Sequence, residues 1–284
     1  MKSIALGQYY PSNSILHRLD ARIKVILAVL YIVCTFLCKD ILSFAVLLLS
    51  AFLLILVSRI PLRIVLRGIR PLLFIMCFTA ILNLFLTKGE GEPLWQLWRI
   101  AIYTDGIFNA VFMVVRIVVL VLGTSLFLTY TTTPIALTDG LESLLKPLRL
   151  LHLPVHEFAM MMTIALRFIP LLSEETGKIM NAQKARGVDF SHGGLIRRAK
   201  ALIPILIPLF VSAFRRAEEL ATAMECRCYR GGAGRTKMTI PHLHVRDVVA
   251  FLLMVGFGVS IFFLGRYSNT LIALVRDVWQ ARFF

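Results

Sequence analysis

Long apolar runs recur along this chain and predict its helices. Charged or turn-forming residues bound each run, and the five runs cover residues 25–38, 41–57, 71–86, 106–130 and 248–264. A hydrocarbon core of about 30 Å needs roughly 20 apolar residues in a helix, so the fourth run is long enough by itself. We therefore predict an all-α, polytopic membrane protein with about five transmembrane helices.

The first two runs are shorter than a bilayer requires, but their flanking residues compensate for this. Lys24 and Lys39 bracket the first run, and Arg59 follows the second. Long basic side chains extend along an apolar surface and bring their charge to the interface, so short runs can still cross. We expect the two runs to form adjacent helices joined near Lys39 and Asp40.

Basic residues indicate on which side of the membrane each connection lies. Lys and Arg are frequent before residue 25 and between residues 59 and 70, whereas the loop at 87–105 is acidic or mixed. Cytoplasmic loops have the excess of Lys and Arg, so the N-terminus is predicted inside and the loop around Glu90 outside. The C-terminus would then lie outside, a placement that Arg266, Arg276 and Arg282 oppose.

Between residues 133 and 247 the pattern changes, because charged residues interrupt the apolar ones at helical spacing. One amphipathic helix is expected to begin near Pro154, and another to cover 194–229. The apolar centre of the second helix, 201–214, is too short to span a bilayer and contains two prolines. We therefore predict three regions, which are membrane helices with four crossings at 1–132, long amphipathic helices on the cytoplasmic side at 133–247, and a last membrane helix with a tail at 248–284.

Composition supports a membrane location and limits the chemistry. Hydrophobic residues make up 58% of the 284 residues, compared with about 45–50% in soluble domains. The formal net charge of +15 agrees with basic cytoplasmic loops and attraction to anionic lipid. The sequence has no P-loop, zinc-protease or serine-hydrolase motif. Its five cysteines and six histidines lack the spacing of a metal site, so we expect buried thiols and no metal.

Two short motifs end the predicted amphipathic helices, and each places an arginine between small residues. They are Ala185, Arg186 and Gly187, and Cys226, Arg227 and Cys228. Small neighbours let a partner backbone approach, and a guanidinium offers a planar fork to a carboxylate. The alternative is that each arginine only complements the negative end of its helix dipole. The spacing alone favours the dipole interpretation, whereas the recurrence of the motif after both helices favours docking on a partner.

Arg116 lies near the middle of the fourth apolar run. An ionisable side chain at that depth costs several kcal/mol unless it is paired or hydrated. Two interpretations stay open. In one, Arg116 makes a polar contact inside the helix bundle or with a partner, and in the other the run is offset and Arg116 lies nearer an interface.

Several stretches of the sequence resemble one family of transporters. Residues 7–9 (Gly-Gln-Tyr) and 14–24 (Ser-Ile-Leu-His-Arg-Leu-Asp-Ala-Arg-Ile-Lys) are similar to the opening of the transmembrane (T) component of energy-coupling-factor transporters. The stretches 138–142 and 165–170 and both arginine motifs also resemble this family, most densely between 133 and 235. The Gly-Gln-Tyr start resembles the shared T component, which serves several substrate-binding subunits, rather than a cobalt- or nickel-dedicated one.

The resemblance implies a scaffold and coupling role in an ATP-driven importer of vitamins or related micronutrients. In this family the T component joins two cytoplasmic ABC-type ATPases to one interchangeable membrane-embedded substrate-binding (S) subunit, in the cell membrane of a prokaryote. The ATPases bind ATP and magnesium, so this chain would be a non-catalytic subunit with no cofactor. Arg186 and Arg227 would each lie at the tip of a coupling helix and enter a groove on one ATPase. The second motif has cysteines where the family commonly has other small residues.

A surface for the S subunit is expected in the same region. Flexible methionine side chains can repack against different partners, which suits a shared component. The residues that we assign to this surface are Met160, Met161, Met162, Leu206, Leu209 and Phe210.

Three other functions compete with this one. An integral membrane enzyme needs a nucleophile, a metal cluster or a carboxylate pair at membrane depth, where the apolar runs provide only Arg116 and Asn83. A self-sufficient secondary transporter or channel usually has several polar or ionisable groups near the membrane midplane, and such groups are sparse in these apolar runs. A nucleic-acid binder is disfavoured by acidic residues within the basic segment and by the lack of aromatic platforms. We therefore expect the lipid bilayer, and no nucleic acid, as a partner.

Overall fold

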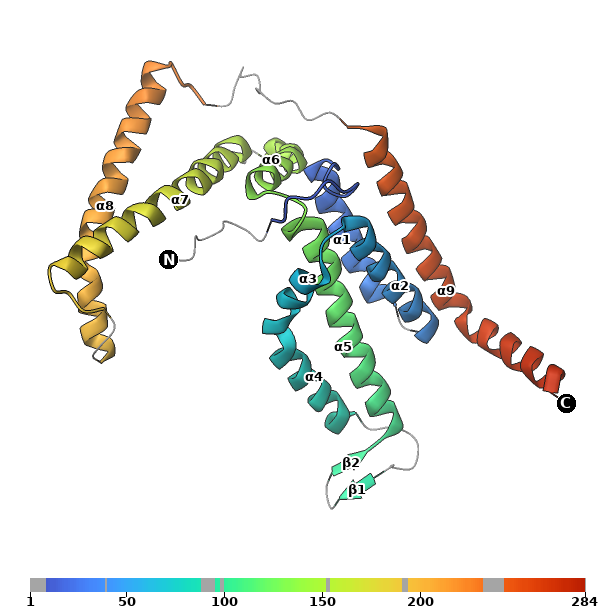
Figure 1. Ribbon diagram of the computed structural model, residues 1–284. Helices are drawn as coiled ribbons and strands as arrows, with labels where there is room; N and C mark the ends of the chain where they lie inside the picture. Colours follow the sequence, from blue (N-terminus) through green and yellow to red (C-terminus); the bar gives the residue numbers. More distant parts are fainter. Residues whose placement is uncertain are drawn as a thin grey trace. The chain divides into compact units, whose positions relative to one another are not determined.

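The computed structural model describes residues 9–38, 40–87, 95–97, 100–151, 154–190, 194–231 and 243–283. The regular secondary structure of these residues is helical apart from one short antiparallel hairpin, so the predicted all-α fold is confirmed (Figure 1). They fall into two compact units. The α7–α8 unit contains the described residues between 141 and 231, and the membrane unit contains those at 9–140 and 243–283.

The membrane unit consists mainly of consecutive apolar helices joined by short turns. Its elements in chain order are α1 (Ala21–Leu37), α2 (Ile41–Ser58), α3 (Leu62–Ile69), the 3-10 turn η1 (Arg70–Leu72), α4 (Leu73–Leu86), the strands β1 (Trp95–Leu97) and β2 (Ile100–Ile102), α5 (Thr104–Thr124), the π-helical turn η2 (Ser125–Thr129), α6 (Pro134–Leu144), which ends in the other unit, and α9 (Val245–Phe283).

The α7–α8 unit is dominated by two long helices. After the 3-10 turn η3 (Lys146–Leu151) come α7 (Val155–Ala185) and α8 (Leu195–Cys226), with 31 and 32 residues. They begin within a residue of the positions predicted from Pro154 and Gly194. Both continue through internal prolines, Pro170 in α7 and Pro204 and Pro208 in α8.

Tyr31 lies at the centre of the membrane unit and joins α1 to its neighbours. The side chain is fully buried, and its ring contacts Phe127 of η2 and Phe257 of α9 at centroid distances of 6.0 and 6.5 Å. The ring also lies against Gly123 of α5, where any Cβ atom would overlap it. Gly123 is therefore the residue that lets α5 approach α1 so closely.

One buried carboxylate ties together the starts of the first and last helices of this unit. Asp247 Oδ1 accepts the backbone N–H of Asp20 at 2.9 Å, and its Oδ2 accepts that of His244 at 2.8 Å. Asp20 in turn caps α1 by accepting the N–H of Arg22 at 2.9 Å. Helix N-termini have N–H groups without intrahelical partners, so Asp247 satisfies two such groups at once. The nearby Lys24 is also buried and donates to the carbonyl oxygen of Thr131 at 2.8 Å.

Among the described residues, five helices are long and apolar enough to cross a membrane, which is the number predicted. Four of them match predicted runs, and these are Ile41–Ser58, Leu62–Leu86, Gly106–Thr129 and Val245–Tyr267. The fifth is Val155–Ala185 in α7, whereas α1, the predicted first crossing, has only 17 residues. Length and composition thus make α7 a candidate crossing, and the assignment of residues 133–247 to the cytoplasmic side stays a prediction.

Candidate functional site

The helices α7 and α8 cross, and a polar cluster joins them (Figure 1). Glu175 of α7 accepts hydrogen bonds from the Ser212 hydroxyl at 2.6 Å and from the Arg216 guanidinium at 3.0 Å, one on each carboxylate oxygen. A carboxylate with both oxygens bonded to a neighbouring helix fixes that helix along its length and around its axis. We call these three residues the crossing cluster.

Arg186 lies at the C-terminal cap of α7, in a backbone arrangement that ends the helix sharply. The N–H of Gly187 bonds to the carbonyl of Lys184 at 3.0 Å, and that of Val188 to the carbonyl of Gln183 at 3.1 Å. This pair of bonds defines a Schellman cap, in which the residue after the cap adopts a left-handed conformation. Gly187 has φ of +88° and fills that position. Glycine does so without the steric cost that a side chain would add.

Arg227 ends α8 in the same arrangement. The N–H of Cys228 bonds to the carbonyl of Glu225 at 2.8 Å, and that of Tyr229 to the carbonyl of Met224 at 3.0 Å. Cys228 has φ of 57°, so a residue with a side chain occupies the position that Gly187 fills in α7. The two predicted motifs are thus the same helix cap, with the arginine at the same place in each.

Both motifs are open to solvent. All six residues that we assigned to ATPase docking, namely Ala185, Arg186, Gly187, Cys226, Arg227 and Cys228, are exposed. The expectation of buried thiols is therefore wrong for Cys226 and Cys228, whereas Cys34 and Cys38 are buried. Within the part of the chain that the structure describes, neither arginine forms an ion pair. Each guanidinium therefore keeps its hydrogen-bond donors available for a partner. The helix dipole attracts the arginine without occupying these donors with another side chain.

The two arginines are equally far from the crossing cluster along their helices. Arg186 follows Glu175 by eleven residues, and Arg227 follows Arg216 by eleven residues. Eleven residues correspond to about 16 Å and about three turns, so each arginine lies close to the helix face that holds the cluster. The crossing thus places both tips at a matched distance from one fixed point.

The residues assigned to the S subunit lie on α7 and α8. Met161, Met162, Leu206 and Phe210 are exposed, whereas Met160 and Leu209 are half-buried. Other large apolar side chains of α8, within the apolar stretch 201–214 that we also expected to contact the S subunit, extend this surface, and they are Leu202, Ile203, Ile207, Val211 and Phe214. Their spacing of three and four residues, visible in the sequence, marks one apolar stripe on the helix.

Arg116 makes its contacts inside the membrane unit. Its guanidinium donates to the carbonyl of Cys38 at 2.7 Å and lies 5.3 Å from the ring centroid of Phe44. Cys38 caps the end of α1, where carbonyl groups lack intrahelical donors. Arg116 thus satisfies one of them and forms a cation–π contact.

Sequence reasoning did not bring Glu175, Ser212 and Arg216 together as a cluster. It also gave no partner for His156, whose Nδ1 lies 3.1 Å from Glu142 Oε1. The sequence did contain one signal for the cluster, which is that Glu175 and Arg216 each precede the arginine of a motif by eleven residues. Among the described residues, no group of three or more His, Cys, Asp or Glu side chains could hold a metal ion.

Comparison with known proteins identifies the family. A family model described as cobalt transport protein matches residues 12–238. A Clostridium kluyveri protein named energy-coupling factor transporter transmembrane protein EcfT is 49% identical over 252 residues, which are 89% of this chain and 93% of that protein. The chain belongs to the energy-coupling factor transporter transmembrane protein family.

A second relative supports the same membership over nearly the full length. The Bacillus subtilis protein of the same name is 45% identical over 264 residues, which are 93% of this chain and 99% of that protein. The resemblance predicted from the sequence motifs is therefore confirmed. With its five apolar helices, this family member is a multi-pass membrane protein and a transmembrane component of an energy-coupling factor transporter.

Proposed function

We propose that this chain is the non-catalytic coupling subunit of an ATP-driven importer for vitamins or related micronutrients, in a prokaryotic cell membrane with its N-terminus in the cytoplasm. Family membership supports the transport role. One observation supports the coupling role, namely that Arg186 and Arg227 lie exposed on identical helix caps at matched distances from the crossing cluster.

In this proposal each arginine docks on a different ABC-type ATPase. Arg186 enters a groove on one ATPase and Arg227 a groove on the other, where a carboxylate can accept the planar guanidinium fork. The small neighbours Ala185 and Gly187, and Cys226 and Cys228, let the groove walls approach. ATP and magnesium are bound by the ATPases, and this chain needs no cofactor.

The apolar surface of α7 and α8 is the proposed contact for a single, interchangeable S subunit. Its exposed methionines and the α8 stripe offer adaptable side chains, which suit several partners in turn. When the ATPases close and reopen, both tips move with them. Because the crossing cluster joins the two helices, this movement reaches the surface that holds the S subunit.

Co-purification tests the docking. A tagged chain is isolated from its native membranes in mild detergent, as wild type, as Arg186→Ala/Arg227→Ala, and as Arg167→Ala/Arg215→Ala. The control pair removes one exposed arginine from each helix away from its cap. We expect two ATPases with the wild type and the control, and a loss of at least tenfold with the cap variant. Equal recovery from all three would refute the docking.

Reconstitution separates this proposal from self-sufficient transport. Liposomes that contain this chain alone should show no substrate flux, whereas liposomes with the co-purified ATPases and S subunit should show flux that requires ATP. Flux through the chain alone would favour a secondary transporter or a channel.

A further inference from the structure

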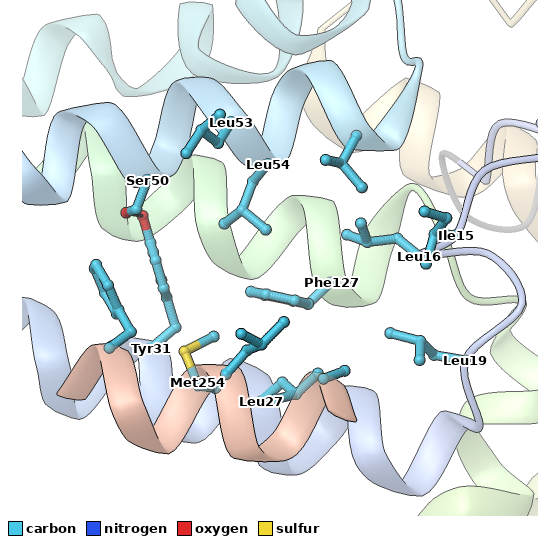
Figure 2. Close-up of a pocket in the computed structure, with 14 residues that line it drawn as sticks. Ile15, Leu16, Leu19, Leu27, Tyr31, Ser50, Leu53, Leu54, Phe127 and Met254 are labelled. Carbon is cyan, nitrogen blue, oxygen red and sulfur yellow. Dashed lines mark hydrogen bonds between the residues drawn. The ribbon is translucent and has the colours of Figure 1, made fainter. Parts of the chain in front are cut away.

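An apolar cavity of about 440 Å³ lies within the membrane unit. Its walls come from α1, α2, α9 and η2, and the segment around Leu16 closes one end. Figure 2 shows Leu16 and Leu19 at this end and Tyr31 with Ser50 at the other. The cavity is thus an elongated space between α2 and α9.

The cavity has no free polar group to offer a ligand. Its lining is apolar except for Tyr31 and Ser50. Their hydroxyl oxygens lie 3.4 Å apart, and the Ser50 hydroxyl donates to the carbonyl of Leu47 at 2.6 Å. The Tyr31 hydroxyl therefore donates to Ser50, and both groups are satisfied. A ligand for such a space needs a long apolar part with no hydrogen-bonding atoms.

One side of the cavity opens toward the surface that faces lipid. Leu53, Val57 and Leu253 line it and are 51%, 40% and 69% exposed. A methylene group occupies about the same volume as a water molecule in the liquid, which is about 30 Å³. The volume of the cavity therefore suits a chain of on the order of fifteen methylenes. That is the length of one phospholipid acyl chain.

Three basic residues lie at the helix ends that border one end of the cavity. The hydrogen bond from the Asp20 backbone N–H to Asp247 brings the starts of α1 and α9 together. The chain reverses between α1 and α2, so the C-terminal end of α2 lies on the same side. Arg18, Arg59 and Arg246 lie at these three helix ends, each exposed and without an ion pair to a described residue. The acidic groups there, Asp20 and Asp247, already accept backbone N–H groups.

We propose that this cavity holds one acyl chain of an anionic phospholipid, whose headgroup lies among Arg18, Arg59 and Arg246. Lipid tails are as apolar as leucine, so the acyl chain in the cavity does not by itself distinguish one lipid class from another. Selectivity comes from the headgroup, and each arginine raises the preference for an anionic over a zwitterionic lipid by about fivefold.

Native mass spectrometry of the full chain with its co-purifying partners tests this assignment. The complex is exposed to equal amounts of phosphatidylglycerol and phosphatidylcholine with the same acyl chains. The wild type should retain one phosphatidylglycerol per chain. Ala250→Trp and Leu253→Trp fill the cavity or its opening and should lose it, whereas Val249→Trp adds the same indole to an exposed position outside the cavity and should retain it.

A charge variant tests the headgroup. Arg18→Gln/Arg59→Gln should keep the cavity and lower the phosphatidylglycerol preference by about fivefold for each arginine removed. Retention of the same lipid by the tryptophan variants at 250 and 253, or a preference that the glutamine variant leaves unchanged, would overturn the proposal. Its failure is distinguishable from a failure of ATPase docking, because these variants leave α7 and α8 unaltered.

Discussion

Glu175 and Arg216 form an ion pair of 3.0 Å at the crossing of α7 and α8, eleven residues before Arg186 and Arg227 respectively. This pair is partly exposed, so it contributes little to stability. Its position gives it a larger expected effect on the relative placement of the two tips. The pair therefore allows placement to be altered without unfolding the chain.

Glu175→Gln should reduce substrate uptake severalfold while ATPase co-purification stays near the wild-type level. The neutral amide loses the charge-assisted bond to Arg216, so the helices can turn about the crossing. Uptake by reconstituted complexes gives the measurement. The exchange Glu175→Arg/Arg216→Glu restores opposite charges and should recover part of the uptake, and unchanged uptake in the single variant would contradict the role of the cluster.

Cys228→Gly should stabilise the end of α8 by about 1 kcal/mol, because a side chain in a left-handed conformation costs roughly 1–2 kcal/mol. Thermal unfolding in detergent and hydrogen exchange at Tyr229 measure the change. The matched control is Cys226→Gly, which places glycine at the last helical residue of α8 and should destabilise by at most about 1 kcal/mol. Equal effects of the two variants would show that the conformation of Cys228 is not strained.

Gly123→Ala should destabilise the membrane unit by about 1–3 kcal/mol, because the new methyl group overlaps the Tyr31 ring. Gly256→Ala is the control, since no atom lies near its Cβ position and α9 is helical there. That substitution should be neutral or slightly stabilising. The midpoint of thermal unfolding is measured for both variants in the same detergent. It should fall for Gly123→Ala and stay unchanged or rise slightly for Gly256→Ala.

Asp247→Ala should cost about 1–3 kcal/mol, because the N–H groups of Asp20 and His244 lose their acceptor. Asp247→Asn keeps one oxygen and should cost less. Removal of the exposed carboxylate in Asp139→Ala should change the unfolding midpoint little. A loss as large for Asp139→Ala would point to net charge rather than capping.

Local features of the sequence predicted most of the fold. Apolar runs of sufficient length specify helices in lipid because no other spanning structure except a closed barrel satisfies the backbone. Pro154 and Gly194 marked the starts of α7 and α8 because proline is favoured at the start of the first helical turn and glycine at the N-cap. The predicted helix over 194–229 contained Pro204 and Pro208, and α8 continues through both, since a helix can lose single backbone bonds when packing supports it.

The long-range contacts were outside the reach of sequence patterns. Asp20 and Asp247 are separated by 227 residues, and periodicity cannot select the partner of a capping group at that distance. The Glu175–Arg216 pair likewise depends on how α7 packs against α8. The left-handed Cys228 was missed because residues with a Cβ rarely adopt that conformation.

The link between Asp20 and Asp247 also has a consequence for biosynthesis. At about 5–20 residues per second, the ribosome needs roughly ten to fifty seconds to make the chain between them. During that interval the N-terminal cap of α1 lacks Asp247 and the surface of α1 lacks α9. The membrane unit therefore matures only when synthesis is nearly complete, because its first helix depends on its last.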